Sequence, residues 1–259
     1  MQAPAAPVTT RTENGVLRVA IRRPEKKNAL TLAMYEALAA AVRHAESDAA
    51  ARVLLLHGTD GVFTAGNDLS DFVLHPPQDE ESPVFQFLQA ISTAAKPIVA
   101  AVAGPAIGIG TTLLLHCDLV YAAPSARFSL PFVSLGLCPE AASSYLLPRI
   151  VGHPRAAELL LFGEPFPAEV AREMGLVNGV VPEDELLTHA VERAETLAAQ
   201  PPASVRLTKR LLKADAAERT QATIREEAQH FLRRLQSPEA AEAFTAFFEK
   251  RAPDFSSFS

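Results

Sequence analysis

The stretch that decides the fold runs over residues 96–140 and reads KPIVAAVAGPAIGIGTTLLLHCDLVYAAPSARFSLPFVSLGLCPE. Residues 98–103 form an apolar run that predicts a buried strand, and 111–115 predict an apolar helix. Between them lies a turn that contains Gly104, Pro105, Gly108 and Gly110. Glycines let a backbone approach a ligand closely, and the first amides of a helix lack partners within that helix. The junction is therefore a candidate site for a negatively charged oxygen.

Two other interpretations of this stretch fail. Residues 97–115 carry no charge and are long enough for a membrane span, but Pro105 and the glycines break the run in its middle. A strand, a turn and a buried helix explain the pattern better. A dinucleotide-binding fingerprint also fails, because Leu113 stands where its third glycine belongs and no acidic residue follows about 20 positions later.

Composition limits the kind of partner and the compartment. The chain has 259 residues, of which 48% are hydrophobic, so it can bury a large core in one or two domains. A net charge of -6 offers no broad basic face, and we expect neither nucleic acid nor a membrane as a partner. Cys117 and Cys138 form no metal or redox spacing. Residues 1–10 lack the pattern of a secretion signal and the terminal SFS is not the peroxisomal tripeptide, so a cytoplasmic location is expected.

The first part of the chain alternates strands and helices. Apolar residues alternate over 15–22, which predicts a strand, and recur at helical spacing over 31–45. Between them RRPEKKN at 22–28 is a positive cluster, either a solvated loop or a phosphate clamp. A second strand at 53–57 leads into GTDGVFTAGNDL at 58–69. This repeats the order of strand, glycine loop and helix, so the backbone N–H groups of both junctions can point at one shared site.

The rest of the chain predicts an α/β core followed by a helical tail. Residues 74–83 hold prolines and acidic residues and are expected to form an exposed, mobile loop. Further strands are expected at 119–123, 126–129 and 176–181, and helices at 84–94, 141–150, 186–199, 204–214, 217–235 and 238–250, with Pro148 interrupting its helix. We expect an α/β fold with a core over residues 1–200 and a helical C-terminal region over 201–259.

Several enzyme classes lack their characteristic residues in this sequence. The seven histidines form no paired ligand spacing, so no metal site is expected. His57 and His116 border apolar runs and are interpreted as packed core residues. The chain has neither the GxSxG elbow of serine hydrolases nor the GxxxxGK[ST] loop of P-loop phosphotransferases.

Glu140 is the candidate acid, because apolar residues and a proline precede it and a helix is expected to follow. One interpretation is structural: an acid in the first turn of a helix is stabilised by the macrodipole. The other is catalytic: apolar surroundings can raise the pKa of a glutamate to roughly 6 to 7, where the group can take and return a proton. These residues alone leave both interpretations open.

Five short segments, spread over nearly the whole chain, form a specific set. They are RPEKKNAL at 23–30, FTAGNDL at 63–69, AGPAIG at 103–108, CDLVYA at 117–122 and AREMGLV at 171–177. In this order and spacing they resemble the crotonase superfamily, also called the enoyl-CoA hydratase/isomerase family. The resemblance implies a spiral of ββα units, a mainly helical C-terminal region that forms trimers, often paired into hexamers, and acyl-CoA thioester substrates. CoA is then part of the substrate, and no separate cofactor is expected.

The resemblance also implies roles for individual residues. The amides of Ala65 and Ile109 would form an oxyanion hole around the thioester oxygen, where each donor is worth about 2.7 to 4 kcal/mol. Lys26 and Lys27 would lie near the CoA phosphates, and FFEK at 247–250 resembles a segment that closes the CoA site. The substrate-binding residues expected on this basis are Lys26, Lys27, Ala29, Leu30, Gly66, Asn67, Asp68, Leu69, Gly108, Phe132, Leu135 and Lys250, with the backbone of Ala29 and Leu30 near the adenine.

Two departures from the family pattern decide the expected subtype. Typical hydratases carry glutamates at the positions of Thr112 and Phe132, so both groups expected for water addition are missing. LPF at 130–132 and LGLCPEAASSY at 135–145 instead resemble the peroxisomal-type Δ3,Δ2-enoyl-CoA isomerase branch, in which the acid matching Glu140 is the catalytic base. We therefore predict an enoyl-CoA isomerase of fatty acid metabolism. A hydratase or other crotonase-type acyl-CoA enzyme, and a non-catalytic acyl-CoA-binding subunit, are the alternatives.

Overall fold

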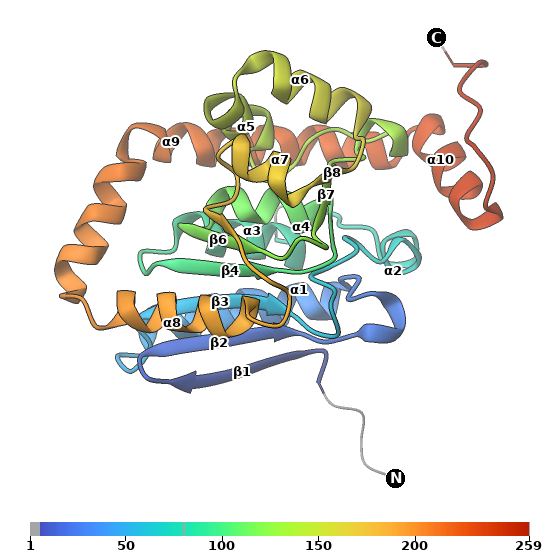
Figure 1. Ribbon diagram of the computed structural model, residues 1–259. Coiled ribbons are helices and arrows are strands. Elements are labelled where there is room, and N and C mark those ends of the chain that lie inside the picture. Colours follow the sequence, from blue (N-terminus) through green and yellow to red (C-terminus); the bar gives the residue numbers. More distant parts are fainter. Residues whose placement is uncertain (1–5, 80, 259) are drawn as a thin grey trace.

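A six-stranded sheet forms the centre of the molecule (Figure 1), in a computed structural model that describes residues 6–79 and 81–258. The strand order is β1-β2-β3-β4-β6-β9, and every pair is parallel except β1 with β2. These strands are β1 (Val8–Glu13), β2 (Val16–Ile21), β3 (Val53–Gly58), β4 (Ile98–Val102), β6 (Leu119–Ala122) and β9 (Gly179–Val180). A second, three-stranded sheet contains β5 (Pro105–Ile107), β7 (Arg127–Ser129) and β8 (Phe166–Pro167).

Alternation along the strands supplies two cores, one on each face of the main sheet. In β3, Leu54 and Leu56 belong to the larger core, whereas Val53 and Leu55 pack against α8 (Leu186–Ala198) on the other face. In Figure 1, α8 lies in front of β2 and β3, and α1 (Leu32–Ser47) and α3 (Pro83–Thr93) lie behind the sheet. Both faces of this parallel sheet are therefore covered by helices, as parallel sheets require.

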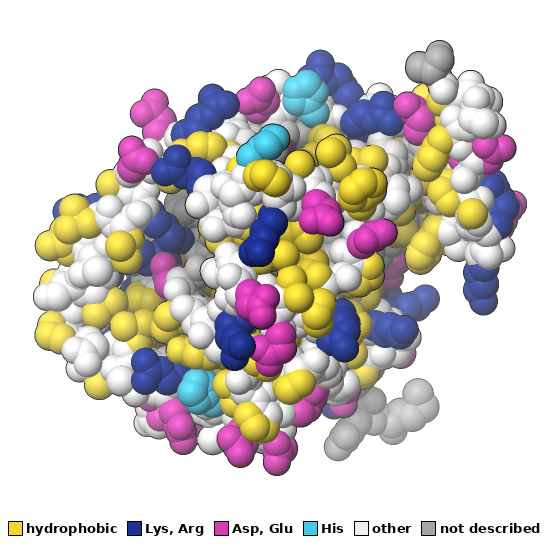
Figure 2. Space-filling model, turned by 45° about the horizontal axis from the view of Figure 1, so that its top comes forward, with side chains coloured by type: hydrophobic (Ala, Val, Ile, Leu, Met, Phe, Trp, Pro, Cys, Tyr) yellow, Lys and Arg dark blue, Asp and Glu magenta, His cyan; other side chains and the backbone are white. Residues whose placement is uncertain are grey.

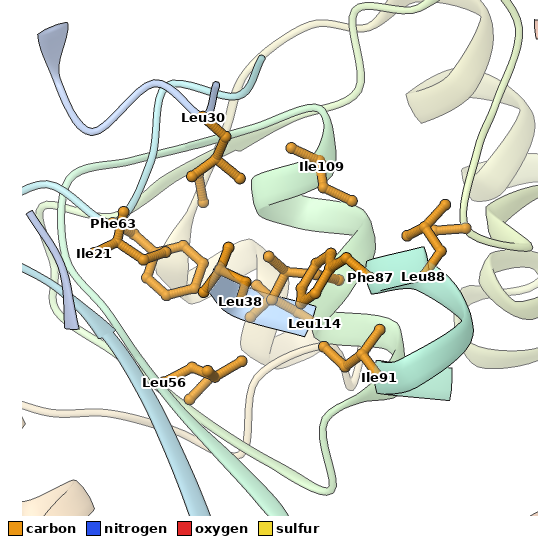
Figure 3. Close-up of a cluster of buried hydrophobic side chains, with 14 of the residues drawn as sticks. Ile21, Leu30, Leu38, Leu56, Phe63, Phe87, Leu88, Ile91, Ile109 and Leu114 are labelled. Atoms are coloured by element: carbon orange, nitrogen blue, oxygen red, sulfur yellow. The ribbon is translucent and has the colours of Figure 1, made fainter. Parts of the chain in front are cut away.

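The larger core reaches the glycine-rich junction. Figure 3 shows Leu30 and Ile109 pointing into the same cluster as Phe63, Phe87 and neighbouring side chains. Ile109 is only 1% exposed, although it begins the short helix α4 (Ile109–Thr112) directly after the glycine turn. Packing of these side chains fixes the backbone of the turn in place.

The C-terminal part of the chain wraps around the sheet as helices. In Figure 1, α9 (Pro202–Leu235) rises along one side and then crosses over the top, and α10 (Pro238–Glu249) follows at its far end. The other helical elements are η1 (Pro24–Lys26), α2 (Leu69–Leu74), η2 (Leu113–His116), η3 (Val133–Leu135), α5 (Ser143–Val151), α6 (His153–Phe162) and α7 (Ala168–Glu173). Within the described residues, no helix combines the length and apolarity that a membrane crossing requires.

The mixed α/β fold with a helical C-terminal region is confirmed, but three local predictions are wrong. The strand β1 was not expected, because alanines and prolines dominate the residues before it; it is stabilised by its antiparallel pairing with β2. The two helices expected at 204–214 and 217–235 are one helix, α9, since neither glycine nor proline interrupts the sequence between them. Pro148 does not interrupt α5: the hydrogen bond that an N–H group would make to Ser144 O is lost there, but the helix continues to Val151 and Gly152 N donates to Pro148 O.

The division into a core over residues 1–200 and a tail over 201–259 stays a prediction. The helix α9 begins near the expected boundary, at Pro202. Its second half nevertheless contributes Ile224, Ala228 and Phe231 to the larger core, together with residues of the main sheet. The tail thus completes the packing around the candidate site.

Candidate active site

The two glycine-bearing loops lie side by side, as the sequence predicted. Thr64 N donates to Pro105 O at 2.9 Å, and Ile107 N donates to Thr64 O at 3.1 Å. Two glycines allow this close approach. A Cβ on Gly66, which has φ +88°, would lie 2.8 Å from the carbonyl oxygen of Ile107, and a Cβ on Gly110 would lie 2.7 Å from Thr64 Cγ2. The backbones of both loops therefore meet at one place.

The structure corrects the choice of one oxyanion donor. The N–H group of Ala65 donates to Lys27 O at 3.0 Å and is therefore not free to bind a substrate oxygen. The next amide, Gly66 N, donates to Thr64 Oγ1 at 3.1 Å. Among the described residues, the N–H groups of Asn67 and Ile109 have no hydrogen-bond acceptor. The available donor pair is Asn67 and Ile109, so the expectation for Ile109 stands as a prediction and that for Ala65 does not.

A cavity of about 270 Å³ opens between these two loops. Its walls are largely apolar, as expected for a site that holds a fatty acyl chain. The lining residues are Ala65, Gly66, Asn67, Leu69, Phe72, Ile107, Gly108, Ile109, Pro131, Phe132, Leu135, Leu137, Phe231 and Phe247. Phe247 on α10 belongs to the segment whose resemblance predicted that it closes the site, whereas Phe231 on α9 was not expected there, because no local motif indicates which side of a C-terminal helix faces a distant cavity. Figure 2 shows α10 standing out from the body, with hydrophobic side chains between them.

Six of the twelve expected substrate-binding residues line this cavity and six do not, among them Leu30 and Asp68. Gly66, Asn67, Leu69, Gly108, Phe132 and Leu135 are part of its walls. Leu30 is fully buried, and its N–H group donates to Gly66 O at 2.8 Å, which ties the basic loop to the glycine loop. The carboxylate of Asp68 caps α2 and forms an ion pair of 2.6 Å with Arg23. Leu30 and Asp68 thus shape the site without lining it.

The residues expected near CoA lie outside the cavity. Lys26 and Lys27 are exposed, and Ala29 follows them at the edge of the same loop. Lys250 is also exposed and ends α10 in a left-handed conformation. Because Arg23 pairs with Asp68, the exposed side chains of Arg22, Lys26 and Lys27 are the cations of this loop that can meet an anion. The contact of Lys26 and Lys27 with CoA stays a prediction.

Glu140 is a buried acid with a raised pKa. It is 4% exposed, and within the described residues its Oε1 has no hydrogen-bond partner. Burial is the main reason why the pKa rises to about 8, and the negative charge of Glu227 adds to the shift. The hydroxyl group of Thr112 lies close enough to oppose the shift, but not in hydrogen-bonding geometry. The carboxyl group is thus poised to exchange a proton near neutral pH.

Glu140 is linked to the cavity through its neighbours. It is not one of the lining residues, but Leu137 of the same loop is. The charge of Glu140 contributes to the raised pKa of the buried Tyr35, whose hydroxyl group donates to Asn67 Oδ1. Asn67 in turn lines the cavity, and its backbone N–H group has no acceptor among the described residues. The carboxyl group of Glu140 thus lies close to residues of the cavity wall without being part of that wall.

A second buried carboxyl group lies near Glu140 and was not expected from the sequence. Glu227 on α9 is 6% exposed and accepts hydrogen bonds from Ala142 and Ser144, which follow Glu140 in the chain. No local pattern could have indicated it, since the partners are more than 80 residues apart. The interpretation of His116 as a packed core residue is confirmed: it is 2% exposed and bonds to Ala141 O at 2.8 Å.

Comparison with known proteins decides the family. The family model described as enoyl-CoA hydratase/isomerase matches residues 11–257. The chain belongs to this family. A crystal structure of an enoyl-CoA hydratase/isomerase from Pseudoalteromonas atlantica T6c superposes with a TM-score of 0.92 at 45% identity, covering 97% of this chain and 100% of that one. The crotonase fold expected from the five segments is confirmed.

The relatives within the enoyl-CoA hydratase/isomerase family carry different activities in their names. Enoyl-CoA delta isomerase 2 of Rattus norvegicus is 36% identical over 93% of this chain, and the match spans 63% of the rat protein's length. The 2,3-dehydroadipyl-CoA hydratase of Escherichia coli K12 is 34% identical over 93% of this chain and 94% of that protein. The chain is thus a crotonase-family enzyme, and the residues of its own site must distinguish isomerase from hydratase.

Proposed function

We propose that this enzyme is a Δ3,Δ2-enoyl-CoA isomerase in which Glu140 carries one proton from C2 to C4 of the acyl chain. The Glu140 carboxylate removes a proton from C2 of a 3-enoyl-CoA, and the electrons of the broken C–H bond form a dienolate. The same carboxyl group then gives the proton to C4, and the double bond comes to lie between C2 and C3. Because one group serves as base and then as acid, the reaction requires no second carboxyl group and consumes no water.

The observation that carries this proposal is a buried acid, Glu140, close to a cavity that has no carboxyl group at either hydratase position. Thr112 and Phe132 occupy the positions of the two hydratase glutamates, and Glu140 is the buried carboxyl group whose pKa lies near 8. Water addition needs one group to activate the water and another to deliver a proton. Phe132 and Leu135 instead line the cavity with apolar surface, which keeps water away from the dienolate.

The amides of Asn67 and Ile109 stabilise the charge that forms in this reaction. Removal of the C2 proton places negative charge on the thioester oxygen, and both N–H groups are free to donate to it. Their positions are fixed by the two glycine loops before the substrate binds, so little reorganisation is needed during the reaction. Preorganised donors of this kind contribute about 2.7 to 4 kcal/mol each to transition-state stabilisation.

A trimer, alone or paired into a hexamer, is the proposed assembly. The first half of α9 exposes Leu207, Leu211 and Leu212, the last of which is 81% exposed. Figure 2 shows hydrophobic side chains gathered on the side of the molecule where this half of α9 lies. Exposed apolar surface of this kind favours contact with another subunit. Light scattering of the purified protein tests this proposal, and a monomer at micromolar concentration would contradict it.

A product assay tests the proposed reaction. Purified enzyme is incubated separately with 3-hexenoyl-CoA and with crotonyl-CoA, and the products are separated by chromatography. We expect conversion of the first substrate to the 2-trans isomer and little or no 3-hydroxybutyryl-CoA from the second. Efficient hydration of crotonyl-CoA without isomerisation would favour the hydratase alternative, and binding of both esters without turnover would favour a non-catalytic subunit.

A further inference from the structure

Glu227 holds the turn that carries Glu140, although it lies on a distant helix. Its Oε2 accepts a hydrogen bond from Ala142 N at 2.6 Å, and its Oε1 accepts bonds from Ser144 N at 2.9 Å and from Ser144 Oγ at 2.5 Å. Ala142 and Ser144 are the second and fourth residues after Glu140. A buried carboxylate with three donors is a rigid anchor for the backbone that it binds.

The backbone of this turn needs such an anchor. Ala141 and Ala142 both adopt left-handed conformations, with φ of 59° and 56°. This conformation is unfavourable for alanine, so surrounding contacts must impose it. Ser143 N donates to Glu140 O at 3.0 Å, which closes the turn directly on the acid. The hydrogen bonds that Ala142 and Ser144 donate to Glu227 therefore fix the position of the Glu140 Cα atom, from which the side chain extends.

The two buried acids differ in their environments. Glu227 accepts three hydrogen bonds, which favour its charged form, whereas within the described residues Glu140 Oε1 accepts none. Burial raises the pKa of both groups, but the donors around Glu227 oppose that shift. Glu227 is thus the acid that ionises first, and its charge then disfavours ionisation of Glu140.

Other ionisable or charged groups close to the pair are Tyr35 on α1, Cys138 before Glu140, Tyr145 on α5, and Arg219, Glu226, His230 and Arg234 on α9.

We propose that Glu227 is a positioning residue for the isomerase reaction: it fixes the turn that aims Glu140 and places a constant negative charge beside that acid. This inference rests on the proposed function, because it assigns a role relative to the proton shuttle. It links the C-terminal helix α9, which also contributes Phe231 to the cavity, to the chemistry of a loop in the core.

Glu227→Gln tests the charge and the geometry together. The amide keeps the shape of the side chain but removes the charge and can accept at only one atom. We expect kcat to fall about 10-fold, and the ascending limb of kcat/KM against pH, which reports Glu140, to move about one unit toward lower pH. Glu226→Gln is the matched control: it removes the same charge from the adjacent, exposed residue, and both kcat and the pH profile should stay unchanged.

A second variant keeps the test decisive. Glu227→Asp keeps the charge but shortens the side chain, so kcat should fall while the ascending limb stays within about 0.3 pH units of the wild-type position. If Glu227→Gln does not fold, Glu227→Asp still tests the anchor, because it changes only the reach of the carboxylate. A limb that does not move in Glu227→Gln, or an unchanged kcat in Glu227→Asp, would overturn the inference.

A direct titration separates this inference from the proposed reaction. Infrared difference spectra of wild type against Glu140→Gln report ionisation of the Glu140 carboxyl group without any turnover. A midpoint that falls by about one unit in Glu227→Gln supports the inference even if 3-enoyl-CoA is not the substrate. If the midpoint is the same with and without the Glu227 charge, Glu227 has no influence on the acid and the inference fails, whatever the reaction is.

Discussion

The candidate site has two halves, which are held in place in different ways. The oxyanion half consists of the amides of Asn67 and Ile109, and the acid half is the carboxyl group of Glu140. The amides of Asn67 and Ile109 are positioned by backbone hydrogen bonds between two loops, with glycines at the points of contact. Glu140 depends on burial and on side chains from distant parts of the chain: the charge of Glu227 raises its pKa, and Thr112 opposes that shift. The oxyanion donors are therefore positioned mainly by the backbone, whereas the proton affinity of the acid, raised mainly by burial, is also adjusted by a neighbouring charge that a point mutation can remove.

The largest expected effect comes from the acid half. Glu140→Gln should lower kcat for 3-enoyl-CoA isomerisation by at least about 10³-fold, because the group that both takes and returns the proton is lost. Glu164→Gln, at an exposed position, is the control and should keep wild-type activity. Retention of more than a tenth of wild-type turnover in Glu140→Gln would contradict the proposed mechanism.

The same variant should be more stable than wild type at alkaline pH. The pKa of Glu140 is raised to about 8 in the folded state, so folded protein keeps a proton that unfolded protein has released. Wild-type stability must then decrease as pH rises from the unfolded pKa of about 4.3 to the folded value. We expect the free energy of unfolding of Glu140→Gln to exceed that of wild type by about 4 to 5 kcal/mol at pH 8 and to be similar to it at pH 4. Thermal denaturation at both pH values measures this.

The oxyanion half should be broken by a backbone change. Gly66→Ala places a Cβ 2.8 Å from Ile107 O and forces a left-handed φ on a residue with a side chain, so the Asn67 amide must move. We expect kcat to fall about 10²-fold. Gly152→Ala is the matched control, because Gly152 also has positive φ but no atom lies within 4 Å of its Cβ position. Equal losses of activity in both variants would show that strain alone, and not the amide, is responsible.

A smaller effect is expected where the two halves meet. Tyr35→Phe removes the hydroxyl group that donates to Asn67 Oδ1, so the side chain beside the free amide loses its anchor. We expect kcat to fall about 10-fold with KM nearly unchanged. Tyr145→Phe, at a partly exposed position outside this contact, should have wild-type kinetics. An unchanged kcat in Tyr35→Phe would show that the backbone loops hold the amide without help from Tyr35.

The smallest effect is expected from the basic loop, which contributes only binding. Lys26→Ala combined with Lys27→Asn should raise KM for 3-hexenoyl-CoA about fivefold at low salt and leave kcat unchanged. Asparagine is chosen for residue 27 because its φ is 50°. The corresponding pantetheine thioester, which lacks the nucleotide phosphates, is the control substrate and should show the same KM with both proteins. An increase in KM for the pantetheine ester as well would place these lysines away from the phosphates.

The elements that depend on local pattern were predictable from the sequence. The strands β2, β3 and β4 and the meeting of the two glycine loops follow from periodicity and glycine placement. The resemblance placed the donor at Ala65 instead of Asn67, and no local pattern shows that the Ala65 N–H group is taken by the Lys27 carbonyl, which lies 38 residues earlier in the chain. Glu227 and Phe231 were missed for the same reason, since only the packing of α9 onto the core brings them to the site. What could not be predicted is the set of contacts between distant segments.

A labelled proton reveals directly whether Glu140 carries the proton from C2 to C4. 3-Hexenoyl-CoA deuterated at C2 is converted in ordinary water, and the position of deuterium in the 2-trans product is determined by NMR and mass spectrometry. A single buried carboxyl group exchanges slowly with solvent, so the account predicts that a substantial part of the deuterium removed from C2 appears at C4. Complete loss of this deuterium to solvent, with C4 protonated from water, would contradict a proton shuttle by Glu140 alone.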